Sequence, residues 1–168
     1  MSTNTLPDVN SLLDNMREQL TPLLNSDSPP LMLGIHTGGW WVAQALHQQM
    51  GLTEPLGELN SQFHRDDFNK SGLHPNVGPS RLPVSVQDRD VILVDDILYT
   101  GRTVRAALNE IFDYGRPRRI LLAVMLDRGQ RELPIQPDIV GGRIDLPNTQ
   151  KIKLNGPEPL ELMLGEKA

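Results

Sequence analysis

Two apolar runs, each followed by a polar turn and a helical pattern, constrain the fold of this chain more than any other feature. Residues 31–35 form a short apolar run, and a small polar turn at 36–39 and a helical stretch at 40–50 follow it. The same order recurs at 91–114, where a β-branched run, a polar segment and an amphipathic helix follow one another. Uninterrupted apolar strands that alternate with helices are typical of a parallel sheet covered on both faces. We therefore expect an α/β fold with a central, mostly parallel sheet flanked by helices on both faces.

The rest of the chain divides around these two units. Residues 10–26 carry apolar side chains at three-to-four spacing, which predicts an amphipathic helix with Asp8 or Asn10 as its N-cap. Residues 120–126 predict another buried strand, whereas 95–102 are expected to form a polar loop. Beyond residue 130, proline-separated apolar pieces at 139–140 and 152–154 are interpreted as short edge strands. We expect one domain over 1–168, which has four parts: an N-terminal helical region at 1–30, a core at 31–126, a flexible loop at 64–83 and C-terminal strands at 127–168.

Charge and cysteine content exclude several classes of protein. The chain has 16 basic and 21 acidic residues, so its formal net charge of -5 does not favour indiscriminate binding to nucleic acid or to anionic membranes. Because it contains 0 Cys, disulfides, thiolate metal sites and a cysteine nucleophile are excluded. Its apolar runs are far shorter than the roughly 18 residues that a membrane span needs. We expect a soluble cytoplasmic protein without a membrane partner.

The segment 91–103 is the most informative about chemistry. A buried strand leads to two adjacent carboxylates, Asp95 and Asp96, and the turn Thr100-Gly101-Arg102-Thr103 then opens a helix. Backbone amides at a helix start and the positive end of its dipole suit a phosphate monoester. Carboxylates repel phosphate, but they suit a vicinal diol or Mg²⁺ with its waters. The segment therefore predicts a site for a phosphorylated sugar at the carboxyl end of a strand.

Other interpretations of this segment were weighed. A Walker B strand requires a P-loop, but the glycines at 34–39 are followed by Trp40-Trp41 and not by Lys and Ser or Thr. The sequence contains neither a dinucleotide G-x-G-x-x-G motif nor two histidines four residues apart, which disfavours a protein zinc site. In a purely structural interpretation, the carboxylates cap a loop and Thr103 caps the helix, which leaves two adjacent carboxylates unexplained.

The same residues resemble a known family. Residues 91–103 are similar to the signature with which type I phosphoribosyltransferases bind 5-phosphoribosyl diphosphate (PRPP). Within that family, the chain resembles the bifunctional pyr operon regulators that are also uracil phosphoribosyltransferases. The similar stretches are residues 34–37, 57–59, 65–67, 95–106, 113–117 and 127–135. The resemblance covers about 31–154 and implies the type I phosphoribosyltransferase fold, with a flexible lid loop and a small C-terminal hood.

This resemblance implies a reaction, in which uracil and PRPP give UMP and pyrophosphate. Catalysis is assigned to Asp95 and Asp96, which stabilise a ribosyl centre with cation character, and Mg²⁺ is held near them mainly through the substrate. The residues implied to bind PRPP or UMP are Asp95, Asp96, Ile97, Leu98, Tyr99, Thr100, Gly101, Arg102 and Thr103. The pyrophosphate loop is implied to contain Thr37, Gly38 and Gly39. The lid is implied to contain Arg65, Asp66 and Asp67, and the base pocket is implied to contain Arg128 and Ile152.

One residue departs from the family pattern. Relatives commonly carry Arg where this chain has Gly38, which removes a charge-assisted contact to the leaving group, worth about 1.5–3 kcal/mol. Arg65 or Arg102 are candidates to compensate. We interpret His36 as a turn residue and Trp40 and Trp41 as helix-packing residues.

The resemblance leaves three functions open: the uracil enzyme, a phosphoribosyltransferase for another base, and a regulator that senses uridine nucleotides with little catalysis. It also implies a homo-oligomer, a dimer or larger. Leader RNA is disfavoured as a partner because the chain is acidic. Gln130, Gln136 and Gly142 occupy places that tend to be basic in RNA-binding relatives, and we interpret the basic residues 116–119 as a solvated helix end.

Overall fold

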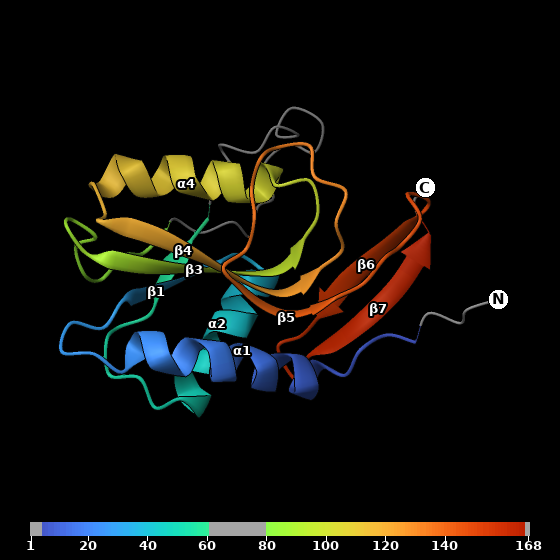
Figure 1. The fold of residues 1–168 in the computed structure, drawn as a ribbon, viewed down its shortest axis with the longest axis horizontal. Helices are drawn as coiled ribbons and strands as arrows, with labels where there is room; N and C mark the ends of the chain where they lie inside the picture. Colours follow the sequence, from blue (N-terminus) through green and yellow to red (C-terminus); the bar gives the residue numbers. More distant parts are fainter. Residues whose placement is uncertain (1–4, 61–79, 167–168) are drawn as a thin grey trace.

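A parallel sheet of five strands forms the centre of the molecule (Figure 1). The computed structural model describes residues 5–60 and 80–166. The strand order is β2-β1-β3-β4-β5, and every neighbouring pair is parallel, which confirms the α/β class. The strands are β1 (Leu31–Ile35), β2 (Gly57–Leu59), β3 (Asp90–Leu98), β4 (Arg119–Asp127) and β5 (Ile139–Arg143).

Helices cover both faces of this sheet, as the apolar strands predicted. The helices α1 (Val9–Leu24) and α2 (Gly38–Gln49) lie on one face, and α4 (Arg102–Tyr114) lies on the other (Figure 1). Alternate residues of the strands point to opposite faces, so the core has two clusters. Ile92 and Val94 of β3 belong to the cluster that contains residues of α1 and α2, whereas Val91 and Leu93 belong to the one that contains residues of α4.

The N-terminal helix begins at the residue that its sequence signal indicated and protects an edge of the sheet. Asp8 is the N-cap and accepts a hydrogen bond from the Ser11 amide at 3.1 Å. Along β5, the edge strand, the amide side chain of Gln19 bonds both backbone groups of Val140: its Nε2 donates to the carbonyl at 2.7 Å, and its Oε1 accepts from the N–H at 3.1 Å. The helix therefore partners backbone groups at an edge where another chain could otherwise add.

Two interpretations of the sequence are corrected by the sheet. Residues 95–98 belong to β3, because they continue the parallel ladder with β4 to the pair Leu98↔Asp127, so the polar loop predicted from residue 95 begins only after Leu98. Residues 139–140 do lie in the edge strand β5, but 152–154 lie in β6 (Gln150–Asn155). This strand pairs antiparallel with β7 (Glu161–Glu166) in a separate two-stranded sheet. The strands β2 and β7 were not expected from periodicity.

No helix within residues 5–60 and 80–166 is both long and apolar enough to cross a membrane.

Candidate functional site

The acidic pair lies at the carboxyl end of β3, next to the carboxyl end of β1. Asp95 is 5% exposed, and its Oδ1 accepts a hydrogen bond from the Asp96 amide at 2.9 Å. The Oδ1 of Asp96 in turn accepts from the Ile97 amide at 2.8 Å. Each carboxylate is thus oriented by the backbone amide of the following residue, which fixes where the remaining oxygen atoms lie. Pre-oriented acceptors of this kind suit the hydroxyl groups of a sugar.

The turn between β1 and α2 packs directly against these carboxylates. A Cβ atom placed on Gly39 would lie 2.7 Å from the Val94 carbonyl oxygen and 2.9 Å from the Asp95 Cα. One placed on Gly38 would lie 2.5 Å from Cγ of Asp96 and closer still to its Oδ2. Glycine is therefore required at 39, where backbone atoms lie in the way, whereas a larger residue at 38 requires the Asp96 side chain to move. The side chain of Asp96 occupies the space that any larger residue at 38 would need.

The phosphate-loop candidate, residues 99–103, leads from β3 into α4. Gly101 is the N-cap with φ at 95°, a left-handed conformation that favours glycine. Glycine has no side chain with which to cap the helix, and the Oγ1 of the preceding Thr100 accepts a hydrogen bond from the Arg102 amide at 3.2 Å. The structural interpretation of Thr103 as the cap was therefore wrong. A helix start without a side-chain cap leaves amide groups that suit an anion.

A second segment, residues 128–133, forms hydrogen bonds with the end of β3 and with the phosphate-loop candidate. The Arg128 amide donates to the Leu98 carbonyl at 3.0 Å, and the Glu132 and Leu133 amides donate to the Thr100 carbonyl at 2.9 and 3.1 Å. These contacts have no signal in the sequence, because the loop and the segment lie about thirty residues apart in the chain.

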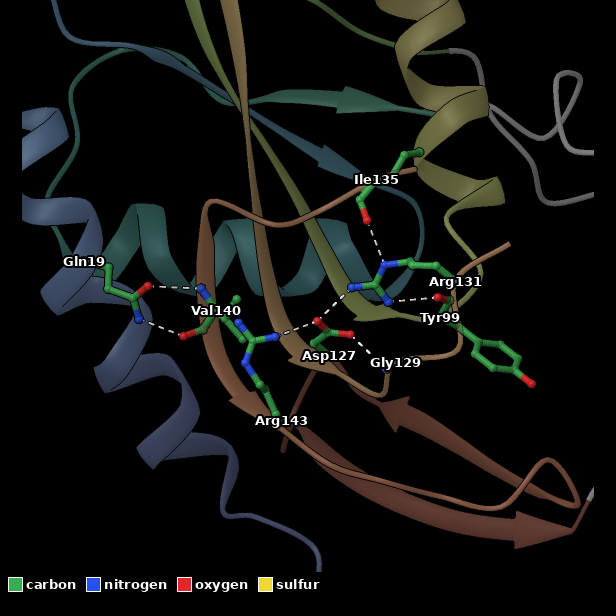
Figure 2. Close-up of polar contacts among 8 residues, drawn as sticks. All are labelled: Gln19, Tyr99, Asp127, Gly129, Arg131, Ile135, Val140 and Arg143. Atoms are coloured by element: carbon green, nitrogen blue, oxygen red, sulfur yellow. Dashed lines mark hydrogen bonds and ion pairs between the residues drawn. The ribbon is translucent and has the colours of Figure 1, made fainter. Parts of the chain in front are cut away.

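A buried ion pair at the end of β4 was also missed by sequence reasoning (Figure 2). Asp127 is 4% exposed, and its Oδ2 contacts both Arg131 Nη2 at 2.8 Å and Arg143 Nη1 at 2.9 Å. Burial alone would raise the pKa of Asp127. The hydrogen bonds from Arg131 and from the Gly129 amide, with the charges of Arg131 and Arg143, outweigh burial and hold this pKa below its ordinary value.

The two base-pocket candidates occupy different surroundings. Arg128 is 4% exposed, and its guanidinium lies 4.0 Å from the centre of the Tyr99 ring, a cation–π contact with the phosphate loop. Its Nη1 donates to the Gln150 carbonyl at 3.2 Å, which ties it to β6. Ile152, also on β6, is buried in the hydrophobic cluster that contains residues of α1 and α2. Beside Arg128, a hollow of about 320 Å³ is lined by Asp127, Arg128, Gly129, Arg143, Ile144 and Asp145.

The polar turn after β1 has one strong side-chain partner. His36 Nε2 lies 2.6 Å from Glu58 Oε2, and the His36 ring stacks on Trp40 with 5.6 Å between ring centres. Trp41 packs against the hydrophobic cluster that contains residues of α1 and α2. These contacts agree with a turn role for His36 and packing roles for both tryptophans.

Most of the predicted lid, including its charged residues, lies outside the residues that the structure describes. Arg65, Asp66 and Asp67 fall among residues 61–79, which the structure does not describe. Of the two residues suggested to compensate for Gly38, Arg102 forms an ion pair with Glu132 at 2.8 Å. Its guanidinium is thus held toward the supporting segment 128–133.

Comparison with known proteins agrees with this geometry. The family model described as "Phosphoribosyl transferase domain" matches residues 3–158. Among curated relatives, the "Bifunctional protein PyrR" of Nitrosococcus oceani is 58% identical over 137 residues, which cover 80% of this chain and 77% of that protein. The protein of the same name from Pseudomonas aeruginosa is 49% identical over 160 residues, which cover 94% of each chain.

Solved structures show the same fold at low sequence identity. A hypoxanthine-guanine phosphoribosyltransferase from Bacillus anthracis has a TM-score of 0.66 at 16% identity, and the match covers 86% of this chain and 85% of that one. A hypoxanthine phosphoribosyltransferase from Staphylococcus aureus has a TM-score of 0.64 at 17% identity, covering 87% and 79%. At this identity the likeness establishes the fold, which is the expected type I architecture.

Proposed function

We propose that this chain, which belongs to the phosphoribosyltransferase family and within it to the PyrR proteins, transfers the phosphoribosyl group of PRPP to uracil. One observation carries the proposal: the carboxylates of Asp95 and Asp96 lie between two helix starts. The start of α2 touches Asp96 through Gly38, and the start of α4 follows four residues after Leu98. A ligand with phosphates at both ends and a diol between them fits this order of groups.

In the proposed reaction, uracil N1 forms a bond to ribose C1 as the bond from C1 to the diphosphate oxygen breaks. The N1 proton is lost, and the products are UMP and pyrophosphate. Positive charge develops on the ribose ring in the transition state, and carboxylates close to the ring stabilise it. Asp95 and Asp96 act in this way and bind the ribose hydroxyls, while the 99–103 loop holds the 5-phosphate and the turn 37–39 receives the diphosphate.

Mg²⁺ fits the chemistry of this donor set. Carboxylate oxygens are suitable ligands, but in residues 5–60 and 80–166 no group of three or more His, Cys, Asp or Glu side chains is placed to hold a metal. Asp95 and Asp96 would therefore contribute directly or through water, and substrate oxygens would complete the shell. When bound, the ion would neutralise charge on the leaving diphosphate.

The test measures pyrophosphate release by the full chain with PRPP, Mg²⁺ and either uracil, orotate, hypoxanthine or no base. We expect release that depends on uracil, and we expect an Asp95→Asn, Asp96→Asn double variant to lose activity by about a hundredfold or more. Asp14→Asn, a change on the exposed surface of α1, is the matched control and should keep wild-type activity. Turnover with hypoxanthine or orotate alone would identify a different base, and an unchanged double variant would refute the assigned roles.

A second function, control of pyrimidine genes, is favoured by the name of the relatives, which calls them bifunctional. We propose that any such control relies on binding of uridine nucleotides at the same site more than on strong binding of leader RNA. The Arg118 and Arg119 side chains are paired with Asp90, whose pKa they lower, and Gly142 packs against Leu12. Nanomolar, salt-dependent binding of a pyr leader RNA would contradict this part of the proposal.

A further inference from the structure

Three successive carbonyl groups, that of the last residue of β3 and the first two of the phosphate loop, are turned toward one neighbouring segment. The Leu98 carbonyl accepts from the Arg128 amide, and the Thr100 carbonyl accepts from the Glu132 and Leu133 amides. The carbonyl between them, that of Tyr99, accepts from the side chain of Arg131, whose Nη1 lies 2.9 Å away (Figure 2). Segment 128–133 therefore sets the direction of the peptide groups that lead into α4.

This direction decides what the loop presents to a ligand. In a planar trans peptide, the carbonyl and the following N–H point to opposite sides. With the carbonyls of Leu98, Tyr99 and Thr100 held toward 128–133, the N–H groups of Tyr99, Thr100 and Gly101 point the other way. If one of these peptide groups were flipped, its carbonyl oxygen would point toward the bound anion and would repel the phosphate.

We infer that Arg131 is a positioning residue for the phosphate loop, an inference that rests on the proposed phosphoribosyl transfer. The bonds to Leu98 and Thr100 are made by backbone amides, which most substitutions would leave in place. The central bond, to Tyr99, depends on a side chain, and a substitution at 131 removes it. Arg131 therefore acts through the loop backbone on the affinity for the 5-phosphate.

The guanidinium of Arg131 is held in a geometry that lysine cannot reproduce. Its Nε donates to the Ile135 carbonyl at 2.8 Å, its Nη1 to the Tyr99 carbonyl, and its Nη2 to Asp127 Oδ2 at 2.8 Å. The side chain is 15% exposed. One planar group thus joins the end of β4 to the loop after β3, whereas an ammonium group is a single point donor.

The chain provides a matched control in Arg143. Its Nη1 contacts the same oxygen of Asp127 at 2.9 Å, but it approaches from β5, and its side chain is 69% exposed. Arg143→Ala therefore removes an ion pair to the same carboxylate without removing the donor to Tyr99. A difference between the variants at 131 and 143 reports on the contact with the loop and not on the loss of a charge beside Asp127.

The experiment compares Arg131→Ala, Arg131→Lys and Arg143→Ala by steady-state kinetics of the full chain. For both variants at 131, we expect KM for PRPP to rise about tenfold to a hundredfold, the effect of losing a hydrogen bond from a charged donor, with KM for uracil changed less than about threefold. Arg143→Ala, which lies on the side of the hollow away from the loop (Figure 2), should leave KM for PRPP within about threefold of wild type. Added methylguanidinium should restore PRPP affinity to Arg131→Ala but not to Arg131→Lys, whose side chain fills the site.

Binding of ribose 5-phosphate, measured by calorimetry, separates this inference from the proposed function. If wild type does not turn over uracil, but Arg131→Ala weakens ribose 5-phosphate binding and Arg143→Ala does not, the proposed function fails and the inference stands. If Arg131→Lys and Arg131→Ala bind ribose 5-phosphate as tightly as wild type, the inference is overturned whatever the activity with uracil. Equal losses in the variants at 131 and 143, or a loss in Arg131→Ala that methylguanidinium does not reverse, also overturn it.

Discussion

Replacement of Gly38 by alanine should disable the site by moving Asp96. A Cβ atom at 38 would lie 2.5 Å from the Asp96 Cγ, whereas ordinary van der Waals contact begins at 3.4 Å. The carboxyl carbon must therefore retreat by about 0.9 Å, and its oxygen on that side must move as well. This motion strains the bond in which the Ile97 amide donates to Asp96 Oδ1.

The magnitude follows from what that carboxylate does in the proposed reaction. A hydrogen bond from a sugar hydroxyl to a charged group contributes about 1.5–3 kcal/mol, so we expect PRPP affinity to fall about tenfold to a hundredfold. The free energy of unfolding should fall by about 0–2 kcal/mol. Alanine favours a helix over glycine by at most about 1 kcal/mol, and crowding against Asp96 costs about 1–3 kcal/mol.

The assay is KM for PRPP together with a urea unfolding curve for each variant. Gly165→Ala is the control, because within the described residues no atom beyond its two chain neighbours lies within 4 Å of a Cβ placed there. Gly38→Arg introduces the residue common in relatives, and we expect it to weaken activity in this chain, since the same Asp96 atoms stand in the way. Wild-type KM in Gly38→Ala, or improved turnover in Gly38→Arg, would refute the reasoning.

Three further changes test side-chain contacts elsewhere in the fold. Asp127→Asn should lose stability at neutral pH but not in acid. Because the pKa of Asp127 is lowered in the folded state, the ionised carboxylate stabilises the fold fully above about pH 4, and this stabilisation is lost as pH falls through the folded-state pKa. The urea midpoints of variant and wild type should therefore differ at neutral pH and converge in acid. Ser80→Ala should destabilise the fold by about 1–3 kcal/mol in urea, because the Ser80 hydroxyl donates to the buried Glu110 carboxylate, whose other oxygen has no partner within the described residues. Gln19→Ala should cost about 1–2 kcal/mol and increase light scattering on heating, because it leaves the backbone groups of Val140 open at the sheet edge; unchanged scattering would count against the edge-protecting role.

Where sequence reasoning succeeded, the information was local. The strand and the helix after it are contiguous in the chain, so their order alone predicted both elements, and the acidic pair and the Thr-Gly turn between them are the basis of the proposed phosphate and diol site. The cap at Asp8 was likewise readable, because it bonds an amide three residues away. Residues 95–98 were misread as loop because their polarity outweighed the apolar pattern, while pairing with β4 made them strand.

The sequence by itself determined the α/β class and the places of the main strands and helices, and it predicted the residues that we propose carry the chemistry. The tertiary structure alone decided which distant residues support them. Asp127 and Arg143 meet because β4 and β5 pair in parallel register, and Gly38 meets Asp96 because β1 lies beside β3. Periodicity reports which face of an element is buried, but it does not report which strands are neighbours. The contacts that orient the phosphate loop, above all that of Arg131, therefore became visible only in three dimensions.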